Sequence, residues 1–347
     1  MDNTFKRIVN VAVEDHASEI YLAAGSPPVF RMNGSLIRRT DLGVDQLKAD
    51  YLEQLAVQLL PNALEKKWTQ HMNALFAVGI EEIGRIRVGL SRQRGSVLVS
   101  VKLLKTLEER ISGVQLHPTI NELHKLKSGL VLLTGGTASI RSRSVLSLLN
   151  NINKTRACHI VTVEHPIECL FKHDRSLVFQ KEVGIDTTSH YYGIQSALDD
   201  GADVIFTDQL PDLKTLDMVI HTANRERLVI AMLPITGVNE VIQHIMSSFE
   251  ANEYHQKKLQ FSACLKAIVS HTLVIDSENN EVTAFEVALG NKAIKRLIVE
   301  EKFEELSKVI RAYESMGMIT FEDGLNQLVQ QGLIDDHVKQ IYMSQKT

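Results

Sequence analysis

Residues 135–142 have the types and spacing of a phosphate-binding loop. Such a loop reads Gly-x-x-x-x-Gly-Lys followed by Ser or Thr, and its backbone N–H groups, lysine and hydroxyl hold the phosphates and the Mg²⁺ of ATP. The residues at these positions are Gly135, Gly136, Thr137, Ala138, Ser139, Ile140, Arg141 and Ser142. The first glycine and the final serine are in register, so ATP with magnesium is the ligand that this spacing indicates.

Two positions of the loop depart from the pattern. The second glycine is Ile140, whose β-branched side chain disfavours a positive φ and blocks close approach of the backbone to a phosphate. The lysine is Arg141, which keeps the charge but carries it on a planar fork instead of a compact ammonium. From the pattern alone, an ordinary strand–turn–helix connection explains these residues at least as well.

The elements around the loop are those that such a site needs. Residues 129–134 form an apolar run bounded by glycine, which predicts a buried parallel strand, and residues 144–153 have helical spacing. Further β-rich runs occur at 159–163, 203–206 and 228–233. Strand and helix patterns that alternate in this way predict a doubly wound α/β sheet. From residue 239 onward the pattern is mostly helical, apart from 273–275 and 282–287.

The chain before this core predicts a small α+β domain. Helical spacing covers residues 5–13 and 47–60, and Asn33-Gly34 is a hairpin turn signal. Strands are predicted at 19–22, 29–32, 85–90 and 96–104. We therefore expect an N-terminal domain over 1–105, a linker over 106–118, a nucleotide-binding core over 119–238 and a mostly helical part over 239–347.

Composition excludes several classes of protein. The chain has 347 residues, 44% of them hydrophobic, and a formal net charge of -4, so it lacks the basic footprint of a nucleic-acid-binding protein. No apolar run approaches the roughly 20 residues that span a bilayer, and the N-terminus has no signal-peptide block. The three cysteines form no CxxC pair, which argues against a zinc site. We expect a soluble cytoplasmic protein.

Seven segments, in order along the whole chain, carry the motifs of one family. They are 17–22 with the glycine and prolines that follow, 84–95, 129–135, 163–168, 180–184, 293–298 and 315–321. Together they resemble the type IV pilus retraction ATPases, the PilT/PilU branch of the type II/IV secretion ATPase superfamily. The related type II secretion ATPases usually carry a four-cysteine metal element, and its absence from this sequence favours the pilus branch.

The resemblance implies an architecture and partners. The fold would be a PAS-like N-terminal domain followed by a RecA-like core, assembled into a ring hexamer with nucleotide between subunits. PilT-like motor subunits, in a uniform or a mixed ring, and the inner-membrane platform of the pilus are the implied partners. Residues 293–298 match a family segment that supports retraction, so a partner surface is expected there.

The departures from the family fall on its chemistry. Glu164 is retained in the aspartate box, but the neighbouring aspartate is His165. The catalytic glutamate is replaced by Gln209, whose amide accepts no proton at neutral pH, and Asp208 lies one position earlier as a candidate substitute. The family's box histidine and two arginines are replaced by Pro234, Gln195 and Asp199. Loss of a general base alone typically removes about 10²–10⁴ in rate, so these changes argue against ordinary ATP hydrolysis.

Other features leave two interpretations open. Arg92 and Arg94 could reach the nucleotide of a neighbouring subunit, as the family's N-terminal arginines do, or could lie on an exposed strand edge. Tyr191-Tyr192 could form an apolar contact between subunits or an ordinary buried pair. The histidines at 165, 190, 221 and 271 lack ligand spacing, so we expect surface or core histidines and no metal site.

Three functions are consistent with these observations. The first is a non-hydrolysing PilT-like subunit that modulates retraction by a true motor. The second is an active retraction ATPase in which Asp208 acts as the catalytic carboxylate and Arg141 replaces the lysine. The third is a sensor that binds nucleotide without cleaving it, through Ser142 and the helix N-terminus, although Ile140 argues against it.

Overall fold

The computed structural model of the chain describes residues 2–113 and 116–344. These residues form two compact units, each with its own sheet. The first unit runs to Glu109 and also contains Glu164–Leu170 and Gln180–Ser189, and the second contains Arg110–Val163, Phe171–Phe179 and the chain from His190 to the last described helix. The N-terminal domain expected over 1–105 is a continuous stretch, so the two later segments are an addition that the sequence did not reveal.

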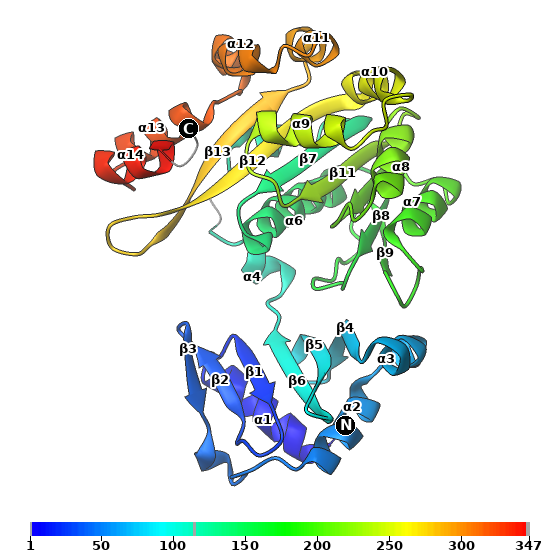
Figure 1. Ribbon diagram of the computed structural model, residues 1–347, viewed down its shortest axis with the longest axis vertical. Helices are drawn as coiled ribbons and strands as arrows, with labels where there is room; N and C mark the ends of the chain where they lie inside the picture. Colours follow the sequence, from blue (N-terminus) through cyan, green and yellow to red (C-terminus); the bar gives the residue numbers. More distant parts are fainter. Residues whose placement is uncertain (1, 114–115, 345–347) are drawn as a thin grey trace. The chain divides into compact units, whose positions relative to one another are not determined.

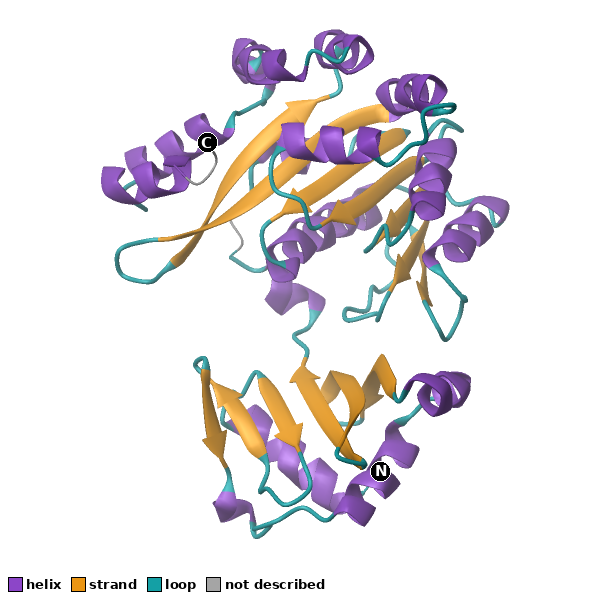
Figure 2. Cartoon of the chain, viewed as in Figure 1, coloured by secondary structure: helices purple, strands orange, loops and turns teal. Residues whose placement is uncertain are grey.

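The first unit is built on a six-stranded antiparallel sheet with strand order β3-β2-β1-β6-β5-β4. Its strands are β1 (Glu19–Leu22), β2 (Val29–Met32), β3 (Ser35–Arg38), β4 (Asn73–Ile80), β5 (Gly84–Gln93) and β6 (Ser96–Leu103), and its main helices are α1 (Asn3–Glu14), α2 (Ala49–Leu59) and α3 (Glu65–His71). Figure 2 shows these strands as one orange layer with helices packed against it. The predicted hairpin at Asn33-Gly34 joins β2 to β3.

The core of the first unit follows from the period of its helices and strands. The carboxylate of Asp2 caps α1 by accepting the backbone N–H of Phe5 at 2.9 Å, which fixes the face that α1 presents. Phe5 and Ile8 of that face are fully buried, together with Ile20 and Val99 of the sheet. Alternation along each strand therefore places one face of the sheet in the core and leaves the other more exposed.

The second unit is built on a seven-stranded sheet with strand order β13-β12-β7-β11-β10-β8-β9. Its strands are β7 (Gly129–Gly135), β8 (His159–Glu164), β9 (Leu177–Glu182), β10 (Val204–Thr207), β11 (Leu228–Leu233), β12 (Leu265–Ile275) and β13 (Glu281–Leu289). The pairs from β12 through β7, β11 and β10 to β8 are all parallel, whereas β13 is antiparallel to β12. The loops after β7, β10 and β11 consequently leave from one edge of the sheet.

Helices lie on both faces of this sheet. The helices from residue 107 onward are α4 (Leu107–Ile111), α5 (Pro118–Leu123), α6 (Ala138–Thr155), α7 (His190–Asp199), α8 (Leu213–Ala223), α9 (Val238–Ser247), α10 (Tyr254–Cys264), α11 (Lys292–Glu300), α12 (Leu306–Ala312), α13 (Phe321–Gln330) and α14 (Asp336–Ser344). In Figure 1, α8 and α9 lie in front of the sheet and α6 lies behind it. Val145 and Leu148 of α6 pack against Val131 and Leu133, the alternate residues of β7.

The structure differs from the sequence expectations in four elements. Strands β4 and β9 had not been predicted, and α4 falls inside the expected linker. The long strand β12 begins at Leu265, not at residue 273, and pairs directly with β7 in the centre of the sheet. Its start was missed because Ser270 and His271 interrupt the apolar pattern. Both side chains are buried in the sheet because each has a hydrogen-bond partner there.

Candidate functional site

Helix α6 begins inside the expected phosphate-binding loop. The predicted helix started at residue 144, but the helical turn is already formed at Ala138, with Thr137 as its N-cap. The Thr137 hydroxyl accepts the backbone N–H of Ile140 at 3.4 Å, and the Thr137 carbonyl accepts the N–H of Arg141 at 3.2 Å. Two backbone donors of the kind that surround a phosphate in an open loop are therefore already bonded within the helix.

The side chain of Arg141 is turned back onto the loop. Its Nη1 atom donates to the carbonyl oxygens of Gly135 at 2.7 Å and Gly136 at 2.8 Å. The residue is only 8% exposed, and its Nε–H has no hydrogen-bond partner among the described residues. Burial lowers the pKa of Arg141 from its ordinary value, although the guanidinium stays charged. The positive charge of Arg141 is thus bonded to carbonyl groups of the same loop.

The two glycines are required by close backbone packing beneath the loop. Gly135 has a φ of +70°, and a Cβ placed there would lie 2.2 Å from the carbonyl oxygen of His271. Gly136 also has a positive φ, and its nearest neighbour would be the Cβ of the same histidine. Packing of β7 against β12 explains both glycines, without any need for a bound phosphate.

His271 is a core histidine with both ring nitrogens bonded. Nδ1 lies 2.8 Å from the carbonyl oxygen of Thr134, and Nε2 lies 2.8 Å from the Ser144 hydroxyl. A carbonyl accepts only, so Nδ1 carries the proton and Nε2 accepts from Ser144. Burial lowers the pKa of His271 to about 4. Over residues 2–113 and 116–344, no group of three or more His, Cys, Asp or Glu is arranged to hold a metal ion.

The hydroxyl expected to bind magnesium is engaged by a side chain of the chain itself. Arg110, in the segment expected to be a linker, donates from Nη2 to the Ser142 hydroxyl at 2.8 Å. A cation placed next to this hydroxyl opposes binding of Mg²⁺ there. Ser142 is partly buried, whereas Ala138 and Ser139 at the tip of the loop are exposed. Local spacing does not predict this contact, because it joins residues 32 positions apart.

The Asp208 side chain forms a pair with a histidine from another element. Nε2 of His190, the first residue of α7, lies 2.8 Å from Oδ1 of Asp208, which directly follows β10. Both side chains are largely buried. The amide of Gln209 lies 3.5 Å from the other carboxylate oxygen, and Gln209 itself is exposed. Asp208 is therefore held by its neighbours at the edge of the sheet from which the loop after β7 also leaves.

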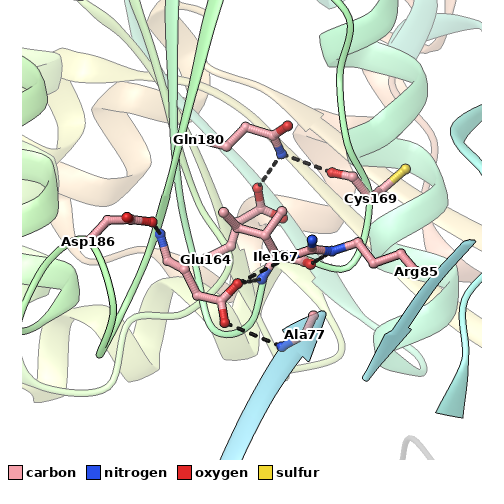
Figure 3. Close-up of polar contacts among 8 residues, drawn as sticks. Ala77, Arg85, Glu164, Ile167, Cys169, Gln180 and Asp186 are labelled. Carbon is pink, nitrogen blue, oxygen red and sulfur yellow. Dashed lines mark hydrogen bonds and ion pairs between the residues drawn. The ribbon is translucent and has the colours of Figure 1, made fainter. Parts of the chain in front are cut away.

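Glu164, at the end of β8, belongs to the first unit. Nε2 of Gln180 donates to Glu164 Oε1 at 3.2 Å and to the carbonyl oxygen of Cys169 at 2.9 Å. Figure 3 shows how the side chain of Gln180, from β9, joins the two ends of the segment Glu164–Leu170. The retained aspartate-box carboxylate is thus buried and bonded to Gln180 of β9.

Glu182 is a functional candidate that the sequence did not single out. Its carboxylate accepts the backbone N–H of Ile167 at 3.0 Å and that of Ala77 at 3.4 Å, and Arg85 lies 3.4 Å away. Arg85 also donates to the carbonyl oxygen of Ile167 at 2.6 Å, so both backbone groups of Ile167 are held (Figure 3). Burial raises the pKa of Glu182, and the three donors oppose that rise. Glu182 lies in the motif at 180–184, which resembles the family but does not by itself indicate a role for this carboxylate.

Two predicted contact residues, Arg92 and Arg94, lie in and after β5. Arg92 forms a two-pronged ion pair with Glu53 at 2.5 and 3.1 Å and stacks over Trp68. Arg94 lies at the turn between β5 and β6 and is exposed. Both side chains are exposed, and Arg94 lies at a turn while Arg92 is bonded within its own unit. In the second unit, Tyr192 is 53% exposed, which argues against an ordinary buried tyrosine pair.

A family model described as "Type II/IV secretion system protein" matches residues 4–347. The chain belongs to this family. Among its relatives, the type IV pilus retraction ATPase PilT of Pseudomonas aeruginosa is 30% identical over 323 residues, covering 92% of this chain and 92% of that protein. The type IV pilus ATPase PilU of the same organism is 28% identical over 333 residues, covering 95% of this chain and 86% of that protein.

Solved structures of the type II/IV secretion family agree with this placement. The crystal structure of the pilus retraction motor PilT with bound ADP has a TM-score of 0.86 and 31% identity, covering 98% of this chain and 96% of that chain. The ATPase DotB of Legionella pneumophila also has a TM-score of 0.86, at 18% identity and with 99% and 96% of the two chains covered, and supports the fold. The expected fold of an N-terminal domain and a RecA-like core is confirmed, and the chain is a PilT-like member of the family.

In the described part of the chain, no helix is both long enough and apolar enough to cross a bilayer.

Proposed function

We propose that this chain is a PilT-like subunit that does not hydrolyse ATP at the rate of an ordinary motor. The observation that carries the proposal is the closed state of the phosphate-binding loop. Helix α6 extends through Ile140, and the guanidinium of Arg141 bonds to the carbonyls of Gly135 and Gly136. Binding of a triphosphate would require these internal bonds to be broken first, which weakens its affinity.

The position of the general base supports the same proposal. The residue at the family's catalytic glutamate position is Gln209, which cannot take a proton from water at neutral pH. Asp208, the only carboxylate beside it in the sequence, is paired with His190. Glu164 retains its carboxylate but accepts a hydrogen bond from Gln180. A loop, a base and a metal ligand are all needed for phosphoryl transfer, and each is altered or engaged here.

We further propose that the chain acts by assembly with an active PilT-like motor. The chain matches retraction ATPases over nearly its whole length, while Arg141 and Gln209 replace the lysine and the catalytic glutamate of the family motifs. The chain would assemble as a subunit of a uniform or a mixed ring, or would contact the inner-membrane platform of the pilus from the cytoplasmic side. The N-terminal domain over 1–105, the core over 119–238 and the part over 239–347 would keep the roles that they have in the family.

The test is ATP turnover by the purified full-length chain, alone and mixed with an active PilT-like motor. The proposal predicts no turnover above background alone, and a changed turnover of the motor in the mixture. Turnover comparable to that of the motor, abolished by Glu164→Ala, would contradict it. Mixing with a motor variant that lacks its catalytic glutamate is the control that assigns any activity to the right subunit.

A further inference from the structure

Helix α6 carries a stripe of buried polar side chains at every third position. The stripe consists of Arg141, Ser144, Ser147, Asn150 and Asn153, and each of these residues is less than 10% exposed. A step of three residues falls about 60° short of a full helical turn, so the five side chains follow a line that winds around the helix. Buried polar side chains in folded proteins nearly always have a hydrogen-bond partner. Partners are therefore expected along the whole stripe.

The middle of the stripe lacks them. Ser144 bonds to His271, and Nδ2 of Asn153 donates to the carbonyl oxygen of Lys172 at 2.8 Å. For Ser147 and Asn150, which are only 9% and 8% exposed, the described residues offer no hydrogen bond to either side chain. Their polar atoms nevertheless keep some contact with solvent, unlike Oγ1 of Thr134 and Nε of Arg141. Two adjacent polar groups on one helix face thus remain available to a ligand.

Both side chains line a cavity of about 710 Å³ in the second unit. Its other polar side chains are Asn121, Asn151 and Gln331, and its apolar ones are Ile111, Leu116 and Pro118. We call this the amide cavity. Among the described residues that line it, none has an ionisable side chain. The volume lies within the range of sites for small organic ligands, which are about 300–1,000 Å³.

We propose that the amide cavity binds a neutral purine nucleoside. An asparagine amide presents one donor and one acceptor side by side, the pattern that pairs with N6 and N7 of adenine. Asn150 provides this edge, the Ser147 hydroxyl provides one further bond, and the apolar residues contact the faces of the ring. No charged side chain is present to favour a phosphate. Ser147 and Asn150 are six and nine positions beyond Arg141, roughly 9 and 14 Å along the helix, so the site is separate from the phosphate-binding loop.

The test is titration of the full-length chain with adenosine, followed by calorimetry or ligand-observed NMR, with ATP as the comparison ligand. The proposal predicts saturable binding of adenosine, no tighter binding of ATP, and at least a tenfold loss of adenosine affinity in Asn150→Leu. Two results overturn it. One is absence of adenosine binding at millimolar concentration, and the other is ATP binding ten times tighter than adenosine, which would assign the affinity to phosphate contacts.

Thermal stability separates a ligand site from a structural role. Without ligand, Asn150→Leu is expected to leave Tm nearly unchanged, because the Asn150 amide has no hydrogen-bond partner among the described residues to lose. Asn153→Leu is the matched control on the same helix and is expected to lower Tm, because the carbonyl of Lys172 loses its donor. A fall in Tm for Asn150→Leu as large as that of the control overturns the proposal. Should Asn150→Leu not fold, Ser147→Ala must weaken adenosine binding, and unchanged affinity there overturns it too. None of these readouts depends on ATP turnover, so they fail independently of the proposed function.

Discussion

Nη1 of Arg141 lies 2.7 Å from the carbonyl oxygen of Gly135, the first glycine of its own phosphate-binding loop. The same nitrogen lies 2.8 Å from the carbonyl oxygen of Gly136. The two carbonyl oxygens therefore compete with any anion for the guanidinium. The substitution of lysine by arginine thus changes more than the shape of a charge, because the buried guanidinium is bonded within the loop.

We predict that Asp208→Asn leaves ATP turnover of the purified chain unchanged. The Asp208 carboxylate is paired with His190, so it does not act as a base in the structure described here. Turnover measured on the wild type and on the variant side by side checks this. His190→Asn serves as the control, since it removes the imidazole partner of Asp208 without removing the carboxylate. A drop in turnover for Asp208→Asn alone would establish the alternative of an active ATPase with a displaced carboxylate.

Removal of the Glu182 carboxylate is expected to loosen the segment Glu164–Leu170. Glu182→Ala leaves the N–H groups of Ile167 and Ala77 without their acceptor, at a cost of about 1–3 kcal/mol each when buried. Hydrogen exchange should become faster at Ile167, while α6 of the second unit keeps its protection. Glu53→Ala, which removes an exposed ion pair with Arg92, is the matched control in the same unit. Equal protection of Ile167 in Glu182→Ala and wild type would disprove the role of Glu182.

We predict that the folded protein loses stability in mild acid because His271 is buried in its neutral form. Its folded-state pKa is about 4, below the ordinary value of 6.5, so the unfolded chain binds more protons between these two values. The free energy of unfolding therefore rises with pH across this window and falls as the pH is lowered through it, by about 3 kcal/mol at most for this group. Urea unfolding from pH 4 to 7 measures the slope. In His271→Gln the slope should flatten, and an unchanged slope would exclude His271 as its source.

Much of the fold follows from local sequence patterns. Strands β1, β2 and β11 have the predicted limits because turn residues or glycines bound their apolar runs. Strand β12 was underestimated because a polar pair, Ser270 and His271, is buried only through contacts with Gly237 and Thr134, which are distant in the sequence. Pairing partners of this kind are set by tertiary structure, which a local pattern does not contain.

The candidate site was predictable in outline and not in its contacts. Ile140 and Arg141 could be identified from the sequence because a standard loop has glycine and lysine at these positions. A β-branched side chain disfavours positive φ, and a guanidinium differs in shape from an ammonium. The bonds from Arg110 to Ser142 and from His190 to Asp208 join different elements, and no spacing rule links them. The role of Glu182 was missed for the same reason, because its acceptor function depends on the backbone of Ala77 in a distant strand.

The most direct test of the closed loop is titration of Mg²⁺-ATP into the wild type and into Ile140→Gly/Arg141→Lys. The double substitution restores the two residues that the loop lacks, and we expect it to gain ATP affinity at least tenfold over a wild type that binds weakly or not at all. Arg143→Lys, two residues further along the same helix, is the control for added lysine. Tight binding of ATP by the wild type, with no gain in the double variant, would contradict a closed loop.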